Sequence, residues 1–554
     1  MTIATGEAGS PPQARGARVD ARPGAWGMGL ALPLAVLALA VAAELVAILV
    51  LNGGRLVYSL DDPYIHMALA EEIARGHYGV NPGEVSSPSS SILWPLLLVP
   101  LARTALAGWA PLLLNLAAAT GTVAIGARLL RLAAGDAPPR SREWMAGIAG
   151  VGLIVAGNQL FLVFGGMEHV LQIALAAAVV LGLVEESRTG RVPPWLAAAV
   201  VAGPLVRYEA LAVSVPALAV LALRGHGRRA ALLGALTAVP LAAFSLFLRS
   251  LGLPALPASV LVKGGGLAAA PGLHAVAVNA LMNWNRLPGR LLAVTALALG
   301  VAVLARSRPR EDRLLAAFGA AVVALHLAFG MVGYGGRYEA YVWTVAALCL
   351  AWVFRRPLAR AAAAAGPVRA AAALAAGLAV FCALQIYLAL MTPLGANNIH
   401  VQQHQMHRFL TQYWRAPVAA NDIGWLTYRS DAHVLDLWGL ASAEAMRARR
   451  ARGGPEWMER MAAAKGAELA MIYDTWFPRR PASWRKVATL RLDGFRFTPA
   501  DDEVQFYART PHAAARAAAL LPRFARTLPP GASLEVFPAA DSATAAGDES
   551  GPDR

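Results

Sequence analysis

Two adjacent acids near the N-terminus, Asp61 and Asp62, are the residues best suited to chemistry. Carboxylates placed beside a hydroxyl group can accept its proton while the oxygen attacks another atom. Pro63 suits the first position of a helix and Gly76 suits a helix end, so Asp62 is the expected N-cap residue. Asp61 has no such structural role, and it lies at the start of the same helix. On spacing alone, the competing interpretation of Asp61 is a solvated loop acid.

A second group of polar and aromatic residues lies in the C-terminal part of the chain. His400, His404 and His407 have helical spacing, which could indicate zinc, but a surface helix is the favoured interpretation. Asp422 is expected at a strand end with Asn421, and Gly424 is expected to permit a tight turn. Sugar rings could stack on tryptophan side chains, although packing is favoured for most of these four: Trp414, Trp425, Trp438 and Trp476.

These residues must be positioned by a chain of 554 residues that is 57% apolar and only 15% charged. Soluble domains are about one-quarter charged, so a soluble enzyme, a disordered chain and a coiled coil are excluded. Apolar stretches follow one another from Ala25 to Met391, which predicts a polytopic α-helical membrane protein with about 11, or at most roughly 13, transmembrane helices. The net charge of +15 comes from arginines in the connections, so no nucleic-acid partner is expected.

The positions of the arginines predict the orientation. Connections rich in arginine are expected to be cytoplasmic, as is the N-terminus. The alternate connections, which include 52–90, 250–287 and everything after Met391, are then extracytoplasmic. This arrangement requires an odd number of crossings. One of the two apolar segments between Ser91 and Arg131 is therefore expected not to cross the membrane fully.

The composition also divides the chain. The helix after Asp62 places Ile65, Ala68, Leu69 and Ile73 on one face, so it is expected to lie along the membrane surface. Helices that alternate with apolar strands predict a small extracytoplasmic α/β domain near the C-terminus. The expected parts are a disordered tail (1–24), a transmembrane domain (25–395), the α/β domain (396–510), and a surface helix with a loose tail (511–554).

Six stretches, in order, resemble the GT-C membrane glycosyltransferases. They are most similar to the branch that contains the mycobacterial terminal arabinofuranosyltransferase. The chain departs from that branch's usual sequence at several positions: Pro63 stands where a small residue is common, Tyr208 stands where proline is common, and Tyr341 stands near a usual proline. The stretch SSPSSSILW is also looser than its counterpart. The six stretches are DDPYIHMALA with the following NPGE and SSPSSSILW, GGMEHV (165–170), LVRYEA (205–210), LPASVLVKGG (256–265), GGRYEAY (335–341) and PVAANDIGWLTYRSDAHVLDLWGL (417–440).

The resemblance implies an inverting transfer of a sugar from a polyprenyl-phosphate donor to an extracytoplasmic glycan, lipid or protein acceptor. It implies a place in the plasma (inner) membrane of a bacterial-type cell and a role in cell-envelope biosynthesis, with an arabinofuranosyltransferase-like activity as the finer expectation. The acidic motif then supplies the base, which we assign to Asp61, with Asp62 as the second catalytic residue. A transporter or flippase of a lipid-linked precursor, and a non-catalytic scaffold of envelope assembly, are the alternatives.

Three cations on the expected outer side, Arg207, Lys263 and Arg337, are the candidates for binding the donor phosphate. Negative charge grows on the departing phosphate and needs fixed cations in a site without water. The alternative for each arginine is an ion pair with the glutamate two residues later, Glu209 or Glu339. Lys263 could instead extend its charged end to the membrane surface.

A divalent metal ion is the one cofactor that the sequence leaves open. Glu168 begins an apolar segment, where an acid is either functional or favoured by the helix dipole. The possible ligands of a cation on the phosphate are Asp61, Asp62, His66 and Glu168. Tyr338 is a further candidate for binding the donor phosphate, and the remaining site candidates are Tyr64 and Glu209.

Overall fold

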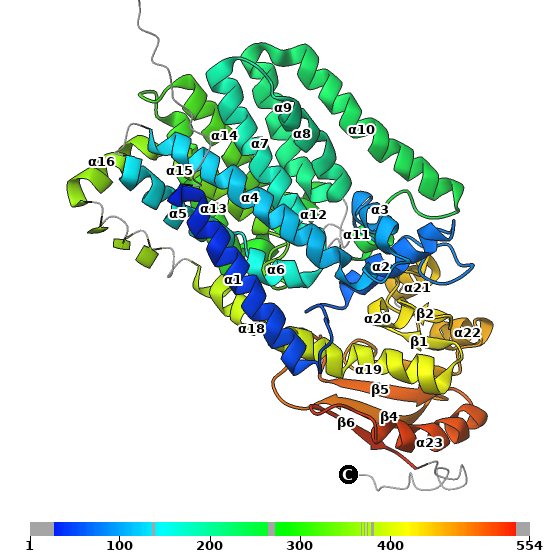
Figure 1. Ribbon diagram of the computed structural model, residues 1–554. Coiled ribbons are helices and arrows are strands. Elements are labelled where there is room, and N and C mark those ends of the chain that lie inside the picture. The colour runs from blue at the N-terminus through cyan, green and yellow to red at the C-terminus, as the bar shows by residue number, and fades with distance from the viewer. Residues whose placement is uncertain are drawn as a thin grey trace, which may run out of the picture.

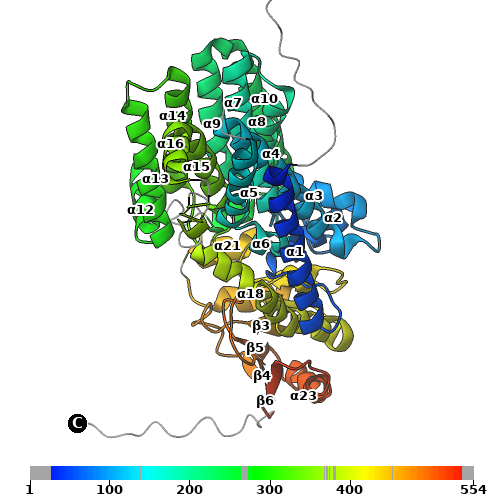
Figure 2. The same ribbon diagram turned by 60° about the vertical axis from the view of Figure 1, so that its left-hand side comes forward.

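The computed structural model describes residues 27–538, apart from 136–138, 264–271, 452 and parts of 367–381. The predicted tail 1–24 therefore lies outside the described residues. The predicted C-terminal part, 511–554, is described as far as residue 538. A body of helices occupies one end of the molecule and a smaller domain built on a sheet occupies the other, as two views show (Figures 1 and 2). This arrangement confirms the predicted combination of apolar helices with a C-terminal α/β domain.

The helical body consists mainly of Ala, Leu and Val, which bury apolar surface and keep all their backbone hydrogen bonds inside each helix. Its helices are α1 (Met28–Leu51), α4 (Ala110–Ala134), α5 (Pro139–Ala156), α6 (Gln159–Gly165), α7 (His169–Thr189), α8 (Pro194–Val206), α9 (Leu211–Leu221), α10 (Gly227–Ser250), α12 (Gly272–Trp284), α13 (Leu287–Leu304), α14 (Arg310–Phe329), α15 (Ala340–Val353), α16 (Arg355–Ala365) and α18 (Ala383–Val401).

Six helical segments in the described part of the chain are long and apolar enough to cross a membrane, or seven if the bent pair α5–α6 is one span. Two shorter apolar helices, α8 and α15, accompany them. One of the six, Tyr208–Ser250, is two helices, because the chain turns at Gly225 (φ 90°) and α9 contacts α10. The count by length is thus lower than the predicted 11, and the number of crossings stays a prediction.

The connection between Ser91 and Ala110 confirms one part of the parity argument. The segment that follows Ser91 forms only α3 (Leu93–Leu98) and two short 3₁₀ turns, whereas α4 is a helix of 25 residues. At a rise of about 1.5 Å per residue, α3 is far too short to span a bilayer. The predicted outer loop 250–287 is also partly helical, because it contains α11 (Ala258–Lys263) and α12.

The C-terminal domain is a mixed six-stranded sheet with the strand order β2-β1-β3-β5-β4-β6. β1 pairs in parallel with β2 and β3, and the three remaining pairings are antiparallel. Its elements are α19 (Gln403–Arg408), the π-helical turn Phe409–Trp414, β1 (Val418–Ala420), α20 (Gly424–Thr427), β2 (Val434–Asp436), α21 (Ala443–Arg450), α22 (Glu456–Ala464), β3 (Leu469–Ile472), β4 (Arg485–Leu492), β5 (Glu503–Ala508), α23 (Pro511–Ala525) and β6 (Ala532–Val536).

Strands β1 to β5 and helix α22 confirm the predicted alternation of helices and apolar strands, but the boundary at 510 is wrong. Helix α23 packs on β4 and β5, and β6 continues the sheet beside β4. The sheet therefore extends to Val536. The sequence hides β6 because ASLEV, although it alternates apolar and polar residues, is only a short edge strand that follows Pro529, Pro530 and Gly531.

Helix α2 (Asp62–Ala74) lies where the two parts of the molecule meet, between α3 and α20 (Figure 1). Its residues from Pro63 to Glu72 are all buried. The expectation that it lies along the membrane surface is therefore wrong: its apolar residues are covered by the C-terminal domain as well as by the helical body. This position holds the two acids at the junction of the two parts.

Candidate active site

Asp61 leaves the helical body and contacts the C-terminal domain. It is the N-cap residue of α2 by position, but its side chain makes no capping hydrogen bond there. Its carboxylate instead accepts hydrogen bonds from the backbone amides of Gly424 (2.7 Å) and Trp425 (2.9 Å), at the start of α20. The first amides of a helix have no partner within the helix, so a carboxylate is stable there.

Gly424 is required by this contact and not by a turn with positive φ. A Cβ atom at this position would lie 2.1 Å from the backbone oxygen of Asp61 and 2.6 Å from its Oδ2. Gly424 is the first residue of α20, so the predicted tight turn is wrong. The glycine lets the acid of one domain reach the backbone of the other.

A third acid, Asp422, lies close to Asp61. Burial, followed by the charge of Asp422, raises the pKa of the Asp61 carboxyl above its ordinary range, although the two amide hydrogen bonds act in the opposite direction. Asp422 itself accepts hydrogen bonds from Gln403 (3.0 Å) and the Tyr473 hydroxyl (2.8 Å). Burial raises its pKa as well. A carboxylate with a raised pKa is a stronger base once it has lost its proton.

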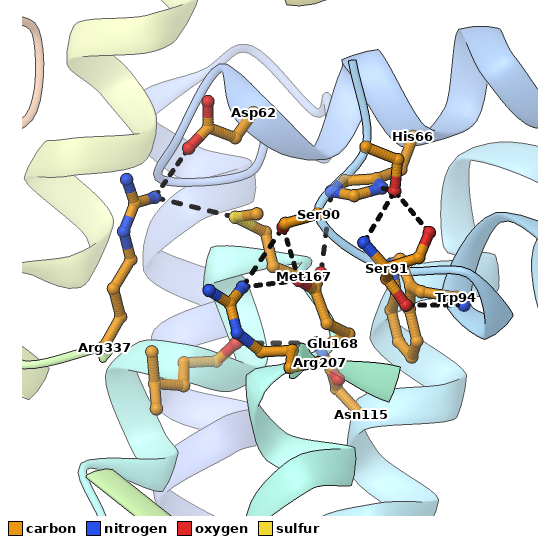
Figure 3. Close-up of polar contacts among 12 residues, drawn as sticks. Asp62, His66, Ser90, Ser91, Trp94, Asn115, Met167, Glu168, Arg207 and Arg337 are labelled. Atoms are coloured by element: carbon orange, nitrogen blue, oxygen red, sulfur yellow. Dashed lines mark hydrogen bonds and ion pairs between the residues drawn. The ribbon is translucent and has the colours of Figure 1, made fainter. Parts of the chain in front are cut away.

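Asp62 points the other way and pairs with Arg337 at 2.7 Å (Figure 3). The prediction that Asp62 caps α2 is wrong, because its carboxylate is engaged by this arginine. The predicted alternative for Arg337, a pair with Glu339, is also wrong: Glu339 accepts hydrogen bonds from the backbone amide of Gly333 (3.0 and 3.2 Å). Arg337 is 8% exposed, and its Nε atom has no hydrogen-bond partner among the described residues.

Arg207 is the centre of a buried ionic group (Figure 3). It pairs with Glu168 at 2.6 Å and with Glu209 at 2.7 Å, so the predicted pair with Glu209 is confirmed. Glu168 is fully buried and also lies 3.5 Å from Nε2 of His66. Ser90, which the sequence did not single out, donates to Glu168 (3.1 Å) and accepts from Arg207 (3.3 Å).

The two tyrosines differ in their surroundings. Tyr338 lies between the arginines, with its ring centre 5.4 Å from the guanidinium carbon of Arg207 and 5.1 Å from that of Arg337. Tyr64 faces the C-terminal domain, where its ring packs on Trp425 at 4.1 Å and its hydroxyl accepts from the backbone amide of Tyr58 (3.0 Å). Tyr338 therefore belongs with the cations, and Tyr64 holds the junction together.

The predicted metal ligands are not gathered around one point. Asp61 contacts backbone amides, Asp62 and Glu168 each pair with an arginine, and only His66 lies near Glu168. Within the described ranges, no group of three or more His, Cys, Asp or Glu side chains is arranged to hold a metal ion. The described residues thus do not fit the divalent cation that the sequence left open.

Lys263 ends α11, and its side chain lies outside the described residues. The helix itself is attached to the loop that follows α2, because the amide of Ala258 donates to the carbonyl of Ser87 (3.0 Å). Lys263 therefore ends a helix that begins beside the segment carrying Ser90.

Sequence reasoning missed the contact between the DDP and NDIG stretches. Both stretches had been singled out, but Asp422 and Gly424 were given structural roles in their own domain. The useful signal is Gly424 itself, because a glycine near the end of a strand can mark a close approach of another chain segment.

Comparisons with known proteins add three findings. A family model described as a domain of unknown function (DUF8728) matches residues 397–507, which is less than half of the chain. The search of curated proteins finds no match. Among solved structures, ArnT from Cupriavidus metallidurans in the apo state is similar (15% identity, 86% of this chain and 98% of that chain, TM-score 0.44).

Two further structures are similar to a comparable degree. They are ArnT from Cupriavidus metallidurans bound to undecaprenyl phosphate (13% identity, 86% of this chain and 99% of that chain, TM-score 0.43) and the apo oligosaccharyltransferase of Archaeoglobus fulgidus (12% identity, 83% of this chain and 73% of that chain, TM-score 0.42). At such scores the likeness is weak, and the function must be argued from the site.

Proposed function

We propose that this chain is a GT-C-type glycosyltransferase of the bacterial-type plasma membrane, with the site on the extracytoplasmic side. It transfers a sugar from a polyprenyl-phosphate donor to an extracytoplasmic acceptor with inversion. The observation that carries the proposal is the division of labour between Asp61 and Asp62. Among the described residues, Asp61 has no cation within ion-pair distance, whereas Asp62 pairs with the buried Arg337.

The proposed reaction is a single displacement. The acceptor oxygen attacks the anomeric carbon of the donor, the bond from that carbon to the phosphate oxygen breaks, and the electron pair leaves with the phosphate. Asp61 accepts the proton of the attacking hydroxyl. The raised pKa of Asp61 suits this step, because a stronger base takes the proton earlier along the reaction.

The leaving phosphate is assigned to Arg337 and Arg207. Both arginines are buried, and the Nε–H group of Arg337 has no hydrogen-bond partner among the described residues. Fixed buried donors stabilise developing negative charge more strongly than mobile water does. Tyr338 keeps the two guanidinium groups apart, and Glu168, Glu209 and Asp62 hold them in place.

The charge balance assigns a role to Lys263. Among the described residues, Glu168 and Glu209 pair with Arg207 and Asp62 pairs with Arg337, so three carboxylates face two guanidinium groups and one negative charge is in excess when all five are ionised. A donor phosphate adds further negative charge, so another cation is needed beside it. Lys263 is the only lysine before Met391, and we assign the donor phosphate to it as well.

A transfer assay tests the proposal. The purified chain is incubated in lipid nanodiscs with a panel of polyprenyl-phosphate sugars, including polyprenyl-phosphate arabinofuranose, and release of polyprenyl phosphate is measured. Release from one donor that is lost in Asp61→Asn supports the proposal. Release from none of the donors, with donors bound and acceptor glycans present, would contradict it.

A further inference from the structure

A second hollow lies at the junction, and none of the proposed catalytic or donor-binding side chains lines it. Two adjoining cavities of about 510 Å³ and about 280 Å³ share Arg55, His404, Arg408 and Gln412 in their walls. We call them together the Arg55 pocket. Ligand sites commonly have volumes of roughly 300 to 1,000 Å³, so the pocket is large enough for a sugar unit with its substituents.

The pocket is positively charged. Arg55, Arg408 and Arg429 line it, and none of its lining residues is Asp or Glu. Among the described residues, neither Arg55 nor Arg408 has a carboxylate within ion-pair distance, and the guanidinium of Arg408 donates hydrogen bonds to Gln405 and Thr527. Arg429 has a weak pair with Glu71 at 3.9 Å. Cations without counter-charges that converge on one hollow indicate an anionic ligand.

The pocket also presents buried polar atoms without partners. Tyr428 is 5% exposed and His400 is 7% exposed, yet the hydroxyl of the first and Nδ1 of the second have no hydrogen bond in the described structure. The same holds for Nε1 of Trp425 and Nε2 of His407. Buried polar atoms usually have partners, so four such atoms around one hollow point to a ligand with many oxygen atoms.

The histidines contribute hydrogen bonds and not charge. Burial, followed by the charge of neighbouring residues, lowers the pKa of His404 to about 3, and burial lowers that of His407 to about 4. Both rings are therefore neutral near pH 7, and they pack against the indole of Trp425 at 4.7 and 5.5 Å. The positive charge of the pocket comes from the arginines alone.

Trp425 connects the pocket to the catalytic base. Its indole lines the pocket, while its backbone amide donates to the Asp61 carboxylate. A ligand in the pocket is thus held by the residue that also holds Asp61. The indole N–H of Trp425, which has no hydrogen-bond partner among the described residues, can donate to a hydroxyl or anionic oxygen of such a ligand.

We infer that the Arg55 pocket binds the acceptor, and that this acceptor is a glycan that carries a carboxylate or phosphate group. The inference rests on the proposed function, because it assigns the second substrate of the same site. It also separates the two substrates: the donor phosphate binds among Arg207, Lys263 and Arg337, and the acceptor anion binds beyond Trp425.

The test measures binding without catalysis. The full chain is placed in nanodiscs of zwitterionic phosphatidylcholine and titrated by calorimetry with trigalacturonate, with neutral maltotriose of the same length, with glucose 6-phosphate and with inorganic phosphate. We expect trigalacturonate or glucose 6-phosphate to bind at least about tenfold more tightly than maltotriose, with the preference decreasing at high salt. Equal binding of charged and neutral glycans would overturn the inference.

Variants locate the binding. Arg55→Gln and Arg408→Gln should each weaken the charged glycan by about tenfold. Arg479→Gln is the matched control, because Arg479 is exposed in the same domain and has no ion pair among the described residues. Trp425→Phe removes the indole N–H but keeps the backbone amide to Asp61, and it should weaken both kinds of glycan. Losses no greater than that of Arg479→Gln would place the ligand elsewhere.

Two further measurements complete the test. The first distinguishes a glycan from free phosphate or a lipid headgroup as the ligand, and the second distinguishes failure of this inference from failure of the proposed function. If inorganic phosphate or phosphatidylglycerol in the nanodisc displaces the glycan fully and itself depends on Arg55, the pocket binds phosphate or a lipid headgroup and the acceptor assignment is wrong. Donor binding should be unchanged in Arg55→Gln. If Arg55→Gln loses binding of the charged glycan but still transfers sugar normally, only this inference is overturned. If the unmodified chain binds the charged glycan but transfers no sugar from any donor, only the proposed function is overturned.

Discussion

Asp61 and Asp62 are neighbours in the chain, but each belongs to a different side of the junction. Asp62 faces the helical body and is neutralised by the guanidinium of Arg337. Asp61 faces the C-terminal domain, where its carboxylate accepts from two backbone amides and lies near another acid, Asp422. A nearby cation lowers the basicity of a carboxylate, while burial and a nearby acid raise it. The difference shows how one helix start can supply both a base and an anchor for a phosphate-binding arginine.

Among the substitutions that test this difference, Asp61→Asn should have the largest effect on the rate of sugar transfer. Loss of a general base costs typically 10²–10⁴-fold in rate, so sugar transfer should fall by about this factor while donor binding stays near normal. Transfer and donor binding are measured on the same preparation. The asparagine keeps one oxygen to accept an amide of α20, so the thermal unfolding curve should change little.

Gly424→Ala tests the same acid without changing it. The added Cβ would lie 2.6 Å from Oδ2 of Asp61, so the carboxylate must move. A misplacement of about 1 Å can cost on the order of 10²-fold in rate, and we expect a loss of transfer near this size. Gly453→Ala is the control, because its Cβ would meet nothing within 4 Å. Wild-type transfer in Gly424→Ala would show that the contact with α20 is dispensable.

Asp62→Asn should act on stability and donor use rather than on proton transfer. It leaves the buried Arg337 without its counter-charge, and breaking a buried ion pair costs up to about 3–5 kcal/mol. We expect a smaller cost of about 1–3 kcal/mol here, because Asp62 keeps 21% of its side chain exposed. The thermal midpoint should fall and the donor KM should rise.

The pair itself is measured with a double-mutant cycle. Arg337→Gln combined with Asp62→Asn should be less destabilised than the sum of the two single variants. Additive losses would mean that the 2.7 Å contact contributes little. Equal losses of transfer in Asp61→Asn and Asp62→Asn, without a change in donor KM, would mean that the two acids act together as one catalytic group.

The sequence was most informative about single residues and least informative about their partners. Asp61, Asp62, Arg207 and Arg337 were all singled out by their types and their places at the ends of apolar segments. The contact of Asp62 with Arg337 spans 275 residues, and that of Asp61 with Gly424 spans 363 residues. Local spacing predicted nearer partners, a helix cap for Asp62 and Glu339 for Arg337, because it carries no information about contacts across domains.

The fold was predicted to a similar depth. The apolar helices and the strands β1 to β5 follow from hydrophobic patterns, and the structure confirms them. The position of α2 could not be predicted, because an apolar helix face looks the same whether a membrane or a protein domain covers it. The sequence also did not predict that Arg55 lines a pocket, because Arg55 lies in the short connection after α1, where its type and spacing indicate no binding role.

Asp422→Asn should have the smallest effect on the transfer rate, and it tests most directly whether Asp61 is the base. Asp61 must be ionised to accept a proton, so the transfer rate should fall as the pH falls through its raised pKa. Removal of the charge of Asp422 lowers this pKa, so the acidic limb of the rate profile should move to lower pH, by about half a unit to one unit. On the plateau the rate should fall a few-fold, because the base is weaker. A limb that stays in place would mean that burial alone sets the basicity of Asp61, and a limb that moves to higher pH would show that Asp61 is not the group that titrates.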